Sequence, residues 1–191
     1  MLDLDHFIAD CRAALGKASP ELAIRELLER AIADPSEVEA AVGPPRLGQI
    51  APLHQSAELS IFNVVWPPGM SIFPHDHRMW ALIGLYGGRE DNTFYRRTVG
   101  GLAAAGGKQL EAREATLLGK AIIHSVANPL RSFTGAIHIY GGDFVNTPRS
   151  QWAADTFEEG PYDMAATRRA FAEANERWRA ACAAAAIPTR E

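Results

Sequence analysis

The sequence has little of several residue types and patterns, and each shortage excludes a class of protein. Only two of its 191 residues are cysteine, Cys11 and Cys182, and they lie near opposite ends of the chain. A disulfide-stabilised framework needs more cysteines, so we expect two free thiols. No apolar run approaches the roughly 18 residues of a membrane-spanning helix, and the acidic segment 1–10 is unlike a signal peptide. We therefore expect a cytoplasmic protein that has no membrane partner.

The chain also lacks an excess of positive charge. It has 19 Lys and Arg against 23 Asp and Glu, a net charge of −4. Proteins that bind nucleic acid usually carry a basic surface for the phosphates, so we expect no nucleic-acid partner. An apolar content of 47% and a charged content of 22% are ordinary for a globular protein. The length suits one domain with attached helices and a buried core.

Residues 1–44 have the pattern of helices. Apolar residues recur at three- and four-residue steps along segment 4–15. Ser19 and Asp34 each precede a proline, which is typical of the start of a helix. Gly43, followed by two prolines, ends the helical pattern. We expect this segment to pack against the domain that follows, and we find no chemistry in it.

From about residue 45 the pattern changes to short strands separated by Gly, Pro and Asn turns, with no helices between them. We expect strands at 58–66, 70–77, 80–86, 91–99, 121–126 and 132–140, with weaker signals in 108–118. The glycine-rich segment 100–107 is typical of a flexible hairpin tip. This organisation predicts a mainly β domain over 45–150, a small antiparallel barrel or jelly roll.

The extension 151–191 ends in a predicted helix. Between about residues 162 and 186, large side chains recur every seven positions, at Met164, Phe171 and Trp178. Residues seven apart lie on one helical face. We expect this face to dock on the barrel, with a contact between two copies of the chain as the alternative, so the protein is expected to be a monomer or a homodimer.

The chemistry of the chain centres on the stretch 69–88. Successive residues of a strand point to opposite faces, so His75 and His77 share one face while Asp76 points away. Apolar neighbours predict that the pair is buried, and two imidazoles so placed can reach one metal ion. An H-x-H pair alone is a weak signal. It is strengthened by a glycine six residues before it and by the downstream stretch 124–128, HSVAN.

These residues resemble the two sequence motifs of the cupin superfamily. The first motif consists of a glycine, two histidines, a glutamate and a second glycine, and the second motif ends in a histidine and an asparagine. In this chain the motif positions hold Gly69, His75, His77, Ala81 in place of the glutamate, Gly88, His124 and Asn128. The resemblance implies a cupin double-stranded β-helix, with His75, His77 and His124 as metal ligands.

The missing glutamate changes the expected metal chemistry. Three neutral imidazoles leave a ferrous ion its full positive charge, whereas a site with one carboxylate neutralises part of it. Such an electron-poor site should favour an anionic ligand such as a thiolate and could then take up dioxygen. Iron, Fe(2+), is the expected cofactor because of the family resemblance, and the donor set is compatible with it.

A narrower resemblance is to the thiol dioxygenase branch of the cupins, the cysteine and 3-mercaptopropionate dioxygenases. It covers roughly residues 45–150 and includes the pair His138 and Tyr140, in addition to the three metal ligands. It implies an iron-dependent enzyme that converts a small thiol and O2 to a sulfinate. His138 would orient Tyr140, whose hydroxyl contacts the bound substrate or oxygen. Family members add a serine to this relay, but the chain has Ala136 at that position.

A thiol substrate that carries a carboxylate would need an arginine at the pocket. Family members place it shortly before the first barrel strand or just after the H-x-Y strand. Arg46 and Arg149 are nearest to those positions, and Arg149 is the better candidate because of the preceding Gly-Gly-Asp. If neither lay in the pocket, an uncharged or amine-bearing thiol would become the candidate.

Two other functions fit the same residues. A metal-dependent cupin lyase or isomerase would use the metal as a Lewis acid and Tyr140 as the base. A sensor module would bind a metal or a small ligand without catalysis. Glu90 could be a fourth metal ligand, but it lies beyond the Gly-Gly turn, so we expect it to be solvated.

Overall fold

Three helices open the chain in the computed structural model, which describes residues 2–185. Asp34 caps the third by accepting a hydrogen bond from the backbone N–H of Ser36 at 3.0 Å. Gly43 then ends it with a φ of 86°, a left-handed conformation that favours glycine. The predicted N-terminal helices are thus confirmed. The helices of the chain are α1 (Leu4–Ala14), α2 (Pro20–Ala31), α3 (Pro35–Val42) and, after the strands, α4 (Met164–Ala185).

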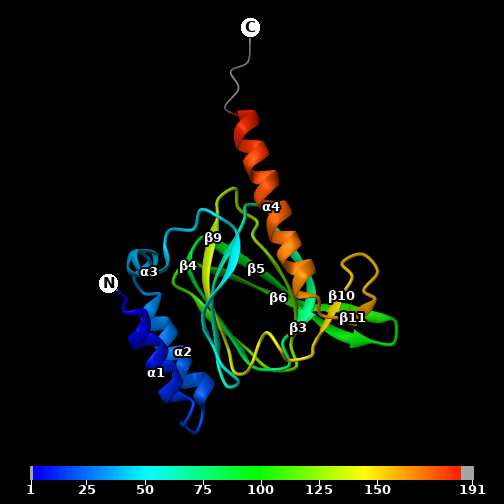
Figure 1. The fold of residues 1–191 in the computed structure, drawn as a ribbon. Helices are drawn as coiled ribbons and strands as arrows, with labels where there is room; N and C mark the ends of the chain where they lie inside the picture. The colour runs from blue at the N-terminus through cyan, green and yellow to red at the C-terminus, as the bar shows by residue number, and fades with distance from the viewer. Residues whose placement is uncertain (1, 186–191) are drawn as a thin grey trace.

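Between α3 and α4 the described residues form eleven strands in two antiparallel sheets (Figure 1). The first sheet has the order β1-β2-β9-β4-β7, and the second has the order β11-β10-β3-β8-β5-β6. The bounds are β1 (Gln49–Gln55), β2 (Ser60–Trp66), β3 (Ser71–Asp76), β4 (Ala81–Gly87), β5 (Arg89–Thr98), β6 (Gly101–Glu111), β7 (Ala115–Leu118), β8 (Ile123–Ala127), β9 (Thr134–Tyr140), β10 (Ser150–Trp152) and β11 (Glu159–Pro161).

The strand pairing is nested, as in a jelly roll. β2 pairs with β9, β3 with β8, β4 with β7 and β5 with β6, each time antiparallel. The chain therefore folds as one long antiparallel double strand, wound so that successive pairs alternate between the two sheets. This arrangement is the double-stranded β-helix that the sequence predicts.

The first sheet separates two apolar layers. Along β4, Ile83 and Leu85 belong to the inner cluster, which lies between the two sheets, whereas Leu82 and Tyr86 belong to the outer cluster, which lies between the sheet and α1–α3. Successive residues alternate between the two clusters because side chains along a strand point alternately to its two faces. Both cysteines are free, and Cys11 lies in the outer cluster, where burial raises its pKa to about 12.

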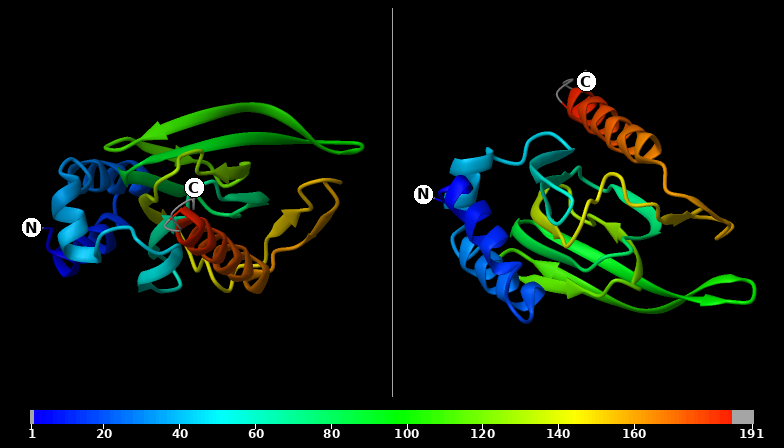
Figure 2. Two further views of the ribbon diagram at one scale, coloured as in Figure 1. Left: turned by 90° about the horizontal axis from the view of Figure 1, so that it is seen from above. Right: turned by 60° about the horizontal axis from the view of Figure 1, so that its bottom comes forward.

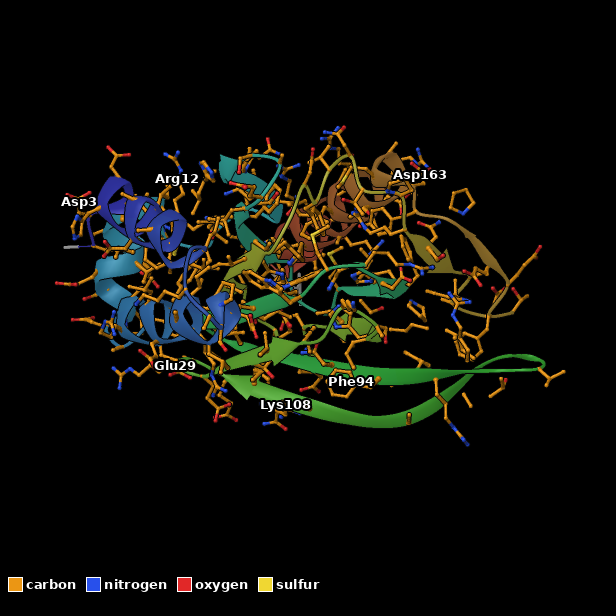
Figure 3. The ribbon with its side chains drawn as sticks, turned by 90° about the horizontal axis from the view of Figure 1, so that it is seen from below. Asp3, Arg12, Glu29, Phe94, Lys108 and Asp163 are labelled. Atoms are coloured by element: carbon orange, nitrogen blue, oxygen red, sulfur yellow. The ribbon has the colours of Figure 1, made fainter. Side chains whose placement is uncertain are left out.

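The helical segments cover different parts of the barrel. The side chains of Asp3, Arg12 and Glu29 mark the N-terminal helices on one side, and Asp163, which precedes α4, lies on the other (Figure 3). No helix within residues 2–185 has the length and apolar character needed to cross a membrane.

The predicted hairpin is present, but its tip is shorter than the predicted segment 100–107. The turn consists of Val99 and Gly100 alone, and β6 begins at Gly101 and pairs with β5 along its length. The register shifts opposite Phe94, where Gly106 has a φ of 140°, as at a β-bulge. Hydrogen bonds to β5 thus hold a sequence of weak strand propensity in a long hairpin that projects from the barrel (Figure 2).

Three strands were not predicted from the sequence. β1 is an edge strand whose register shifts between Pro52 and His54, and this irregularity interrupts its period. β10 and β11 have three residues each, too few to show a period. Both follow residue 149 and extend the second sheet, where Gln151 pairs with His75 of β3.

α4 docks on the barrel through the predicted face. The ring of Phe171 packs against Trp66, with 5.1 Å between their centroids. One turn further, the Asn175 side chain holds the backbone of Gly48, donating to its carbonyl at 2.9 Å and accepting from its N–H at 2.8 Å. Beyond Trp178, which packs edge-on against Phe133, the helix projects away from the barrel (Figure 1).

Candidate metal centre

Three buried histidines converge between the sheets. His75 on β3 lies opposite His124 on β8 in the sheet register, and His77 follows directly after β3. The Nε2 atom of His77 lies 3.2 Å from Nε2 of His75 and 3.3 Å from Nε2 of His124. The predicted ligands are therefore brought together, and the prediction that His75 and His77 share a buried face is confirmed.

The spacing of two of the three nitrogen pairs fits a single metal ion. Nitrogens that each lie about 2.1 Å from one ion are about 3.0–3.4 Å apart when the angles between them are about 90–109°. The two Nε2 separations fall in this range, and the ligand atoms of the three residues all lie within 4.8 Å of one another. The donor set therefore suits one ion held by imidazole alone.

Hydrogen bonds behind two of the rings direct Nε2 toward the cluster. Nδ1 of His75 lies 3.1 Å from the carbonyl oxygen of Phe73, and Nδ1 of His124 lies 2.7 Å from Oδ1 of Asn92. Both oxygens are acceptors, so each Nδ1 carries the proton. The Nε2 lone pairs are then free for a metal, the usual arrangement behind histidine ligands.

Burial keeps the three imidazoles in their neutral, ligating form. It is the main cause that lowers the pKa of His75 to about 4; the hydrogen bond with Phe73 opposes the shift, and the charges of Arg149 and His138 add to it. It also holds the pKa values of His77 and His124 well below the ordinary range, with the other histidines of the cluster adding to the effect. A charged imidazolium in this dry site would be costly.

A sharp turn follows the second histidine. Arg78 has a φ of 60°, a left-handed conformation that non-glycine residues seldom adopt. Its Nε atom lies 2.7 Å from Oδ2 of Asp76, and the other oxygen, Oδ1, accepts a hydrogen bond from the backbone N–H of Ser150 at 2.8 Å. The predicted outward direction of Asp76 thus serves to hold the turn after His77.

The other motif residues shape the strands. Gly69 and Gly88 have φ values of 66° and 77°, and a Cβ atom on Gly88 would lie 2.3 Å from Oγ1 of Thr134. The side chain of Asn128 donates hydrogen bonds to the carbonyl oxygens of Trp66 and Pro67, at 3.1 and 3.0 Å. These positions therefore fix the backbone around the site and contribute no ligand.

His138 and Tyr140 lie beside the histidine cluster on β9. The Tyr140 hydroxyl lies 3.1 Å from Nδ1 of His138, and its ring centroid lies 5.0 Å from that of His77. Burial raises the pKa of Tyr140 far above its ordinary value, so the hydroxyl stays protonated. Ala136 is buried two residues before His138 and offers no hydroxyl to it.

Glu90 is buried, which contradicts its predicted solvated position. Its exposed fraction is 0%, and its carboxylate accepts hydrogen bonds from Nε1 of Trp66 at 2.8 Å and from Nδ2 of Asn92 at 3.0 Å. The same carboxylate lies 3.6 Å from Nε2 of His138. The prediction failed because β5 begins at Arg89, directly after the Gly-Gly turn, so that Glu90 already points into the barrel.

A small cavity lies between the three histidines, His138 and Tyr140. It holds about 30 Å³ of free space, enough for about two water molecules since each needs roughly 10–15 Å³. The three histidines, His138 and Tyr140 line it together with apolar side chains from both sheets. Tyr162 and Thr167 close it from the side of α4. This volume suits an ion with a small ligand.

Arg149 is buried next to the cavity wall. Its guanidinium carbon lies 4.0 Å from the ring centroid of Phe144 and 3.9 Å from that of Tyr162, and both rings line the cavity. Nη1 donates to the carbonyl oxygen of Phe144, whereas Nε and Nη2 are buried without a hydrogen-bond partner among residues 2–185. Arg46, the second candidate, is exposed in the loop before β1 and is not among the residues that line the cavity.

The residues that the sequence analysis missed are Trp66, Asn92 and Tyr162. Asn92 follows Glu90 by two positions, so both side chains point into the barrel from β5, whose burial alternates at its start. That alternation is visible in the sequence once the strand is known to begin at Arg89. No sequence pattern identifies Tyr162, which reaches the cavity because the chain returns to it before α4.

No family model matches the chain. Solved structures of similar shape include an RmlC-like cupin with a double-stranded β-helix fold from Methanocaldococcus jannaschii, with 9% identity, a TM-score of 0.42 and coverage of 50% of this chain and 80% of that chain. A cupin superfamily protein from Desulfitobacterium hafniense has 18% identity, a TM-score of 0.43 and coverage of 55% and 87%. A Bacillus halodurans protein has 15% identity, a TM-score of 0.48 and coverage of 55% and 77%. The assignment of this chain to the double-stranded β-helix fold rests on its own strand pairing, and within that fold the three histidines could hold one metal ion.

Proposed function

We propose that the protein is an iron-dependent thiol dioxygenase, which converts a small thiol and O2 to the sulfinate. The observation that carries the proposal is a group of three buried histidines that could hold one metal ion and that, within residues 2–185, includes no carboxylate. This donor set leaves the positive charge of a divalent ion unreduced, which favours an anionic sulfur ligand. The proposal goes beyond the fold, which is compatible with many activities.

His75, His77 and His124 would hold the iron through their Nε2 atoms. A ferrous ion there would supply positive charge, open coordination positions and one-electron chemistry. The protein fixes the three donors in advance, through the strand register and the acceptors behind the rings. It also excludes water, because the cavity is small and apolar side chains from both sheets surround it.

Arg149 would bind the carboxylate of the substrate. A buried guanidinium with two unpaired nitrogens costs free energy, which a carboxylate would offset by accepting hydrogen bonds from them. Arg149 also adds to the lowering of the pKa of His75 and His77, so its charge acts on the cavity. Its stacking on Phe144 and Tyr162 would hold the guanidinium in one orientation.

The Tyr140 hydroxyl would form a hydrogen bond with the bound substrate at the cavity wall. Its proton is retained because burial raises its pKa, so it suits a neutral hydrogen-bonding role. The same shift makes Tyr140 a poor base, which weighs against the lyase or isomerase alternative.

The proposal is tested by supplying the ferrous protein with 3-mercaptopropionate, L-cysteine and cysteamine under air. We expect O2 consumption with at least one thiol, and the product should be a sulfinate that gains both oxygen atoms from ¹⁸O2 by mass spectrometry. Failure of the iron-loaded protein to oxidise any small thiol would contradict the proposal.

Two arginine variants test the substrate class. Arg149→Ala should raise KM at least tenfold for thiols that carry a carboxylate, because a charge-assisted pair is lost. It should leave KM for cysteamine within about twofold. Arg46→Ala should change neither value. An equal rise for both substrates in Arg149→Ala would mean that this residue supports the fold and not the carboxylate.

A further inference from the structure

Glu90 is a carboxylate sealed between the sheets. Its two oxygens accept hydrogen bonds from Trp66 and Asn92, and within residues 2–185 its one ion-pair contact is with an imidazole, His138. A fully buried carboxylate with no Arg or Lys beside it lowers stability compared with an apolar side chain of similar size. Packing alone therefore does not account for Glu90 at this position.

We propose that Glu90 is a positioning residue that sets the direction of the hydrogen bonds in two arms. The metal arm runs through Asn92 to the ligand His124, and the phenol arm runs through His138 to Tyr140. The reason is that both oxygens of Glu90 accept hydrogen bonds, from Nε1 of Trp66 and from Nδ2 of Asn92. Each group that contacts Glu90 must therefore present an N–H to it, and this requirement passes along both arms.

In the metal arm, the carboxylate fixes the Asn92 amide. Nδ2 of Asn92 donates to Oε1 of Glu90 at 3.0 Å, so the amide oxygen faces the other way, toward His124. That oxygen accepts the Nδ1 proton of His124 at 2.7 Å. His124 is then held as the tautomer whose Nε2 lone pair points at the cluster. With the opposite amide orientation, Nε2 would carry the proton and could not bind a metal.

In the phenol arm, the carboxylate fixes the His138 tautomer. Nε2 of His138 lies 3.6 Å from Oε2 of Glu90, beyond hydrogen-bond distance, and within residues 2–185 it is buried with no hydrogen-bond partner. We place its proton on the side of this carboxylate, where a small shift would close a hydrogen bond. Nδ1 is then unprotonated and accepts the Tyr140 hydroxyl at 3.1 Å. The remaining lone pairs of the hydroxyl oxygen are left for a donor in the cavity. Glu90 thus replaces the hydroxyl that Ala136 cannot supply.

The tautomers of the natural protein test the inference directly. In two-dimensional ¹H–¹⁵N spectra of the metal-free and the diamagnetic Zn(II) protein, His138 should be the Nε2–H tautomer. His124 should be the Nδ1–H tautomer in both. An Nδ1–H tautomer of His138 in the metal-free protein would overturn the inference, whether or not any variant folds.

Two variants separate the arms. Glu90→Gln leaves one acceptor oxygen for the two donors, Trp66 and Asn92. The Zn(II) affinity should therefore fall about 10–100-fold, as it does when other residues that hydrogen-bond to a metal ligand are changed. The His138 ¹⁵N shifts should also change. Asn92→Ala should lower Zn(II) affinity and leave the His138 shifts unchanged. Glu158→Gln, an exposed carboxylate, is the matched control for the charge. Equal Zn(II) affinities in Glu90→Gln and Glu158→Gln would overturn the inference.

The consequence for catalysis rests on the proposed function, but the tautomers and the Zn(II) affinities do not. If the wild type oxidises thiols, Glu90→Gln should lower kcat with little change in KM, since it misplaces groups that contact the substrate without itself contacting it. If the wild type oxidises no thiol and the tautomers are as stated, the proposed function fails while this inference stands.

Discussion

The outer and inner clusters lie on opposite faces of the same sheet and differ in polarity. The outer cluster, between α1–α3 and the sheet, is apolar, and at its centre Leu28 of α2 lies directly over Gly84 of β4. The inner cluster has an apolar frame that encloses the three histidines, His138 and Glu90. Apolar contact stabilises the fold in both, but buried polar groups reduce that gain in the inner one. The outer cluster thus contributes mainly to stability, whereas the inner cluster also contains the candidate metal site.

Leu28→Ala should have the largest effect on stability. Leu28 is fully buried, so the change leaves a cavity and should lower the free energy of unfolding by about 2–5 kcal/mol. Urea denaturation of the metal-free protein measures it. The metal affinity of the folded variant should stay within twofold of wild type. A cost below about 1 kcal/mol, or a changed metal affinity, would mean that the two clusters are not separate.

Gly84→Ala should have the next largest effect on stability, because its added methyl group would crowd the Leu28 side chain. A Cβ atom on Gly84 would lie 2.8 Å from Cγ of Leu28. We expect a loss of about 1–3 kcal/mol in wild type and a smaller loss in the Leu28→Ala background, where the space is open. A double-mutant cycle measures the coupling. Additive losses would show that the Cβ atom meets other atoms instead.

Tyr140→Phe should affect chemistry and leave the fold nearly unchanged. Removing the hydroxyl leaves the apolar ring stacked on Phe144, so the free energy of unfolding should change by about 1 kcal/mol or less. Turnover of the best thiol should fall about tenfold to a hundredfold with iron content unchanged. Steady-state kinetics at saturating thiol measures the loss. A wild-type rate would remove Tyr140 from the mechanism.

Arg97→Ala should have the smallest effect. Arg97 on β5 and Glu159 on β11 form an ion pair with two hydrogen bonds, but their side chains are 48% and 40% exposed. The pair therefore contributes about 1 kcal/mol or less to the free energy of unfolding. Hydrogen bonds from Arg97 and Ser150 lower the pKa of Glu159 from 4.5 to about 2. A lowered carboxylate pKa stabilises the folded state above pH 4.5, and this contribution disappears as the pH falls toward 2. Unfolding at pH 7 and pH 2 checks it: a difference between wild type and variant that is as large at pH 2 as at pH 7 would contradict the assignment, whereas a smaller remainder at pH 2 would come from the contact of Arg97 with the Trp152 ring.

The fold could be predicted where local patterns are strong. Helix starts at proline and strands rich in β-branched residues are local signals, and both were placed within a few residues. Only the end of β6 was predicted, within the weak signal in 108–118, because its glycines adopt strand conformation through pairing with β5. Such pairing is a property of the folded sheet and leaves no trace in the period of β6 itself.

The histidine cluster could be predicted because its ligands follow a motif with fixed spacing. Glu90 could not, because its environment depends on where β5 begins and on which strands meet across the barrel. Trp66 and Asn92, its two donors, lie on β2 and β5 of different sheets. Spatial neighbours of this kind have no common sequence pattern, so the structure is needed to find them.

The most direct test of this account is the iron content of the purified protein. After anaerobic loading with Fe(II) and removal of free metal, the wild type should hold about one iron per chain by elemental analysis. The His75→Ala/His77→Ala variant should hold almost none, and its fold, followed by circular dichroism, should be intact because the outer cluster is untouched. Stoichiometric iron in the double variant, or none in the wild type, would contradict the assignment of the inner cluster as a metal centre.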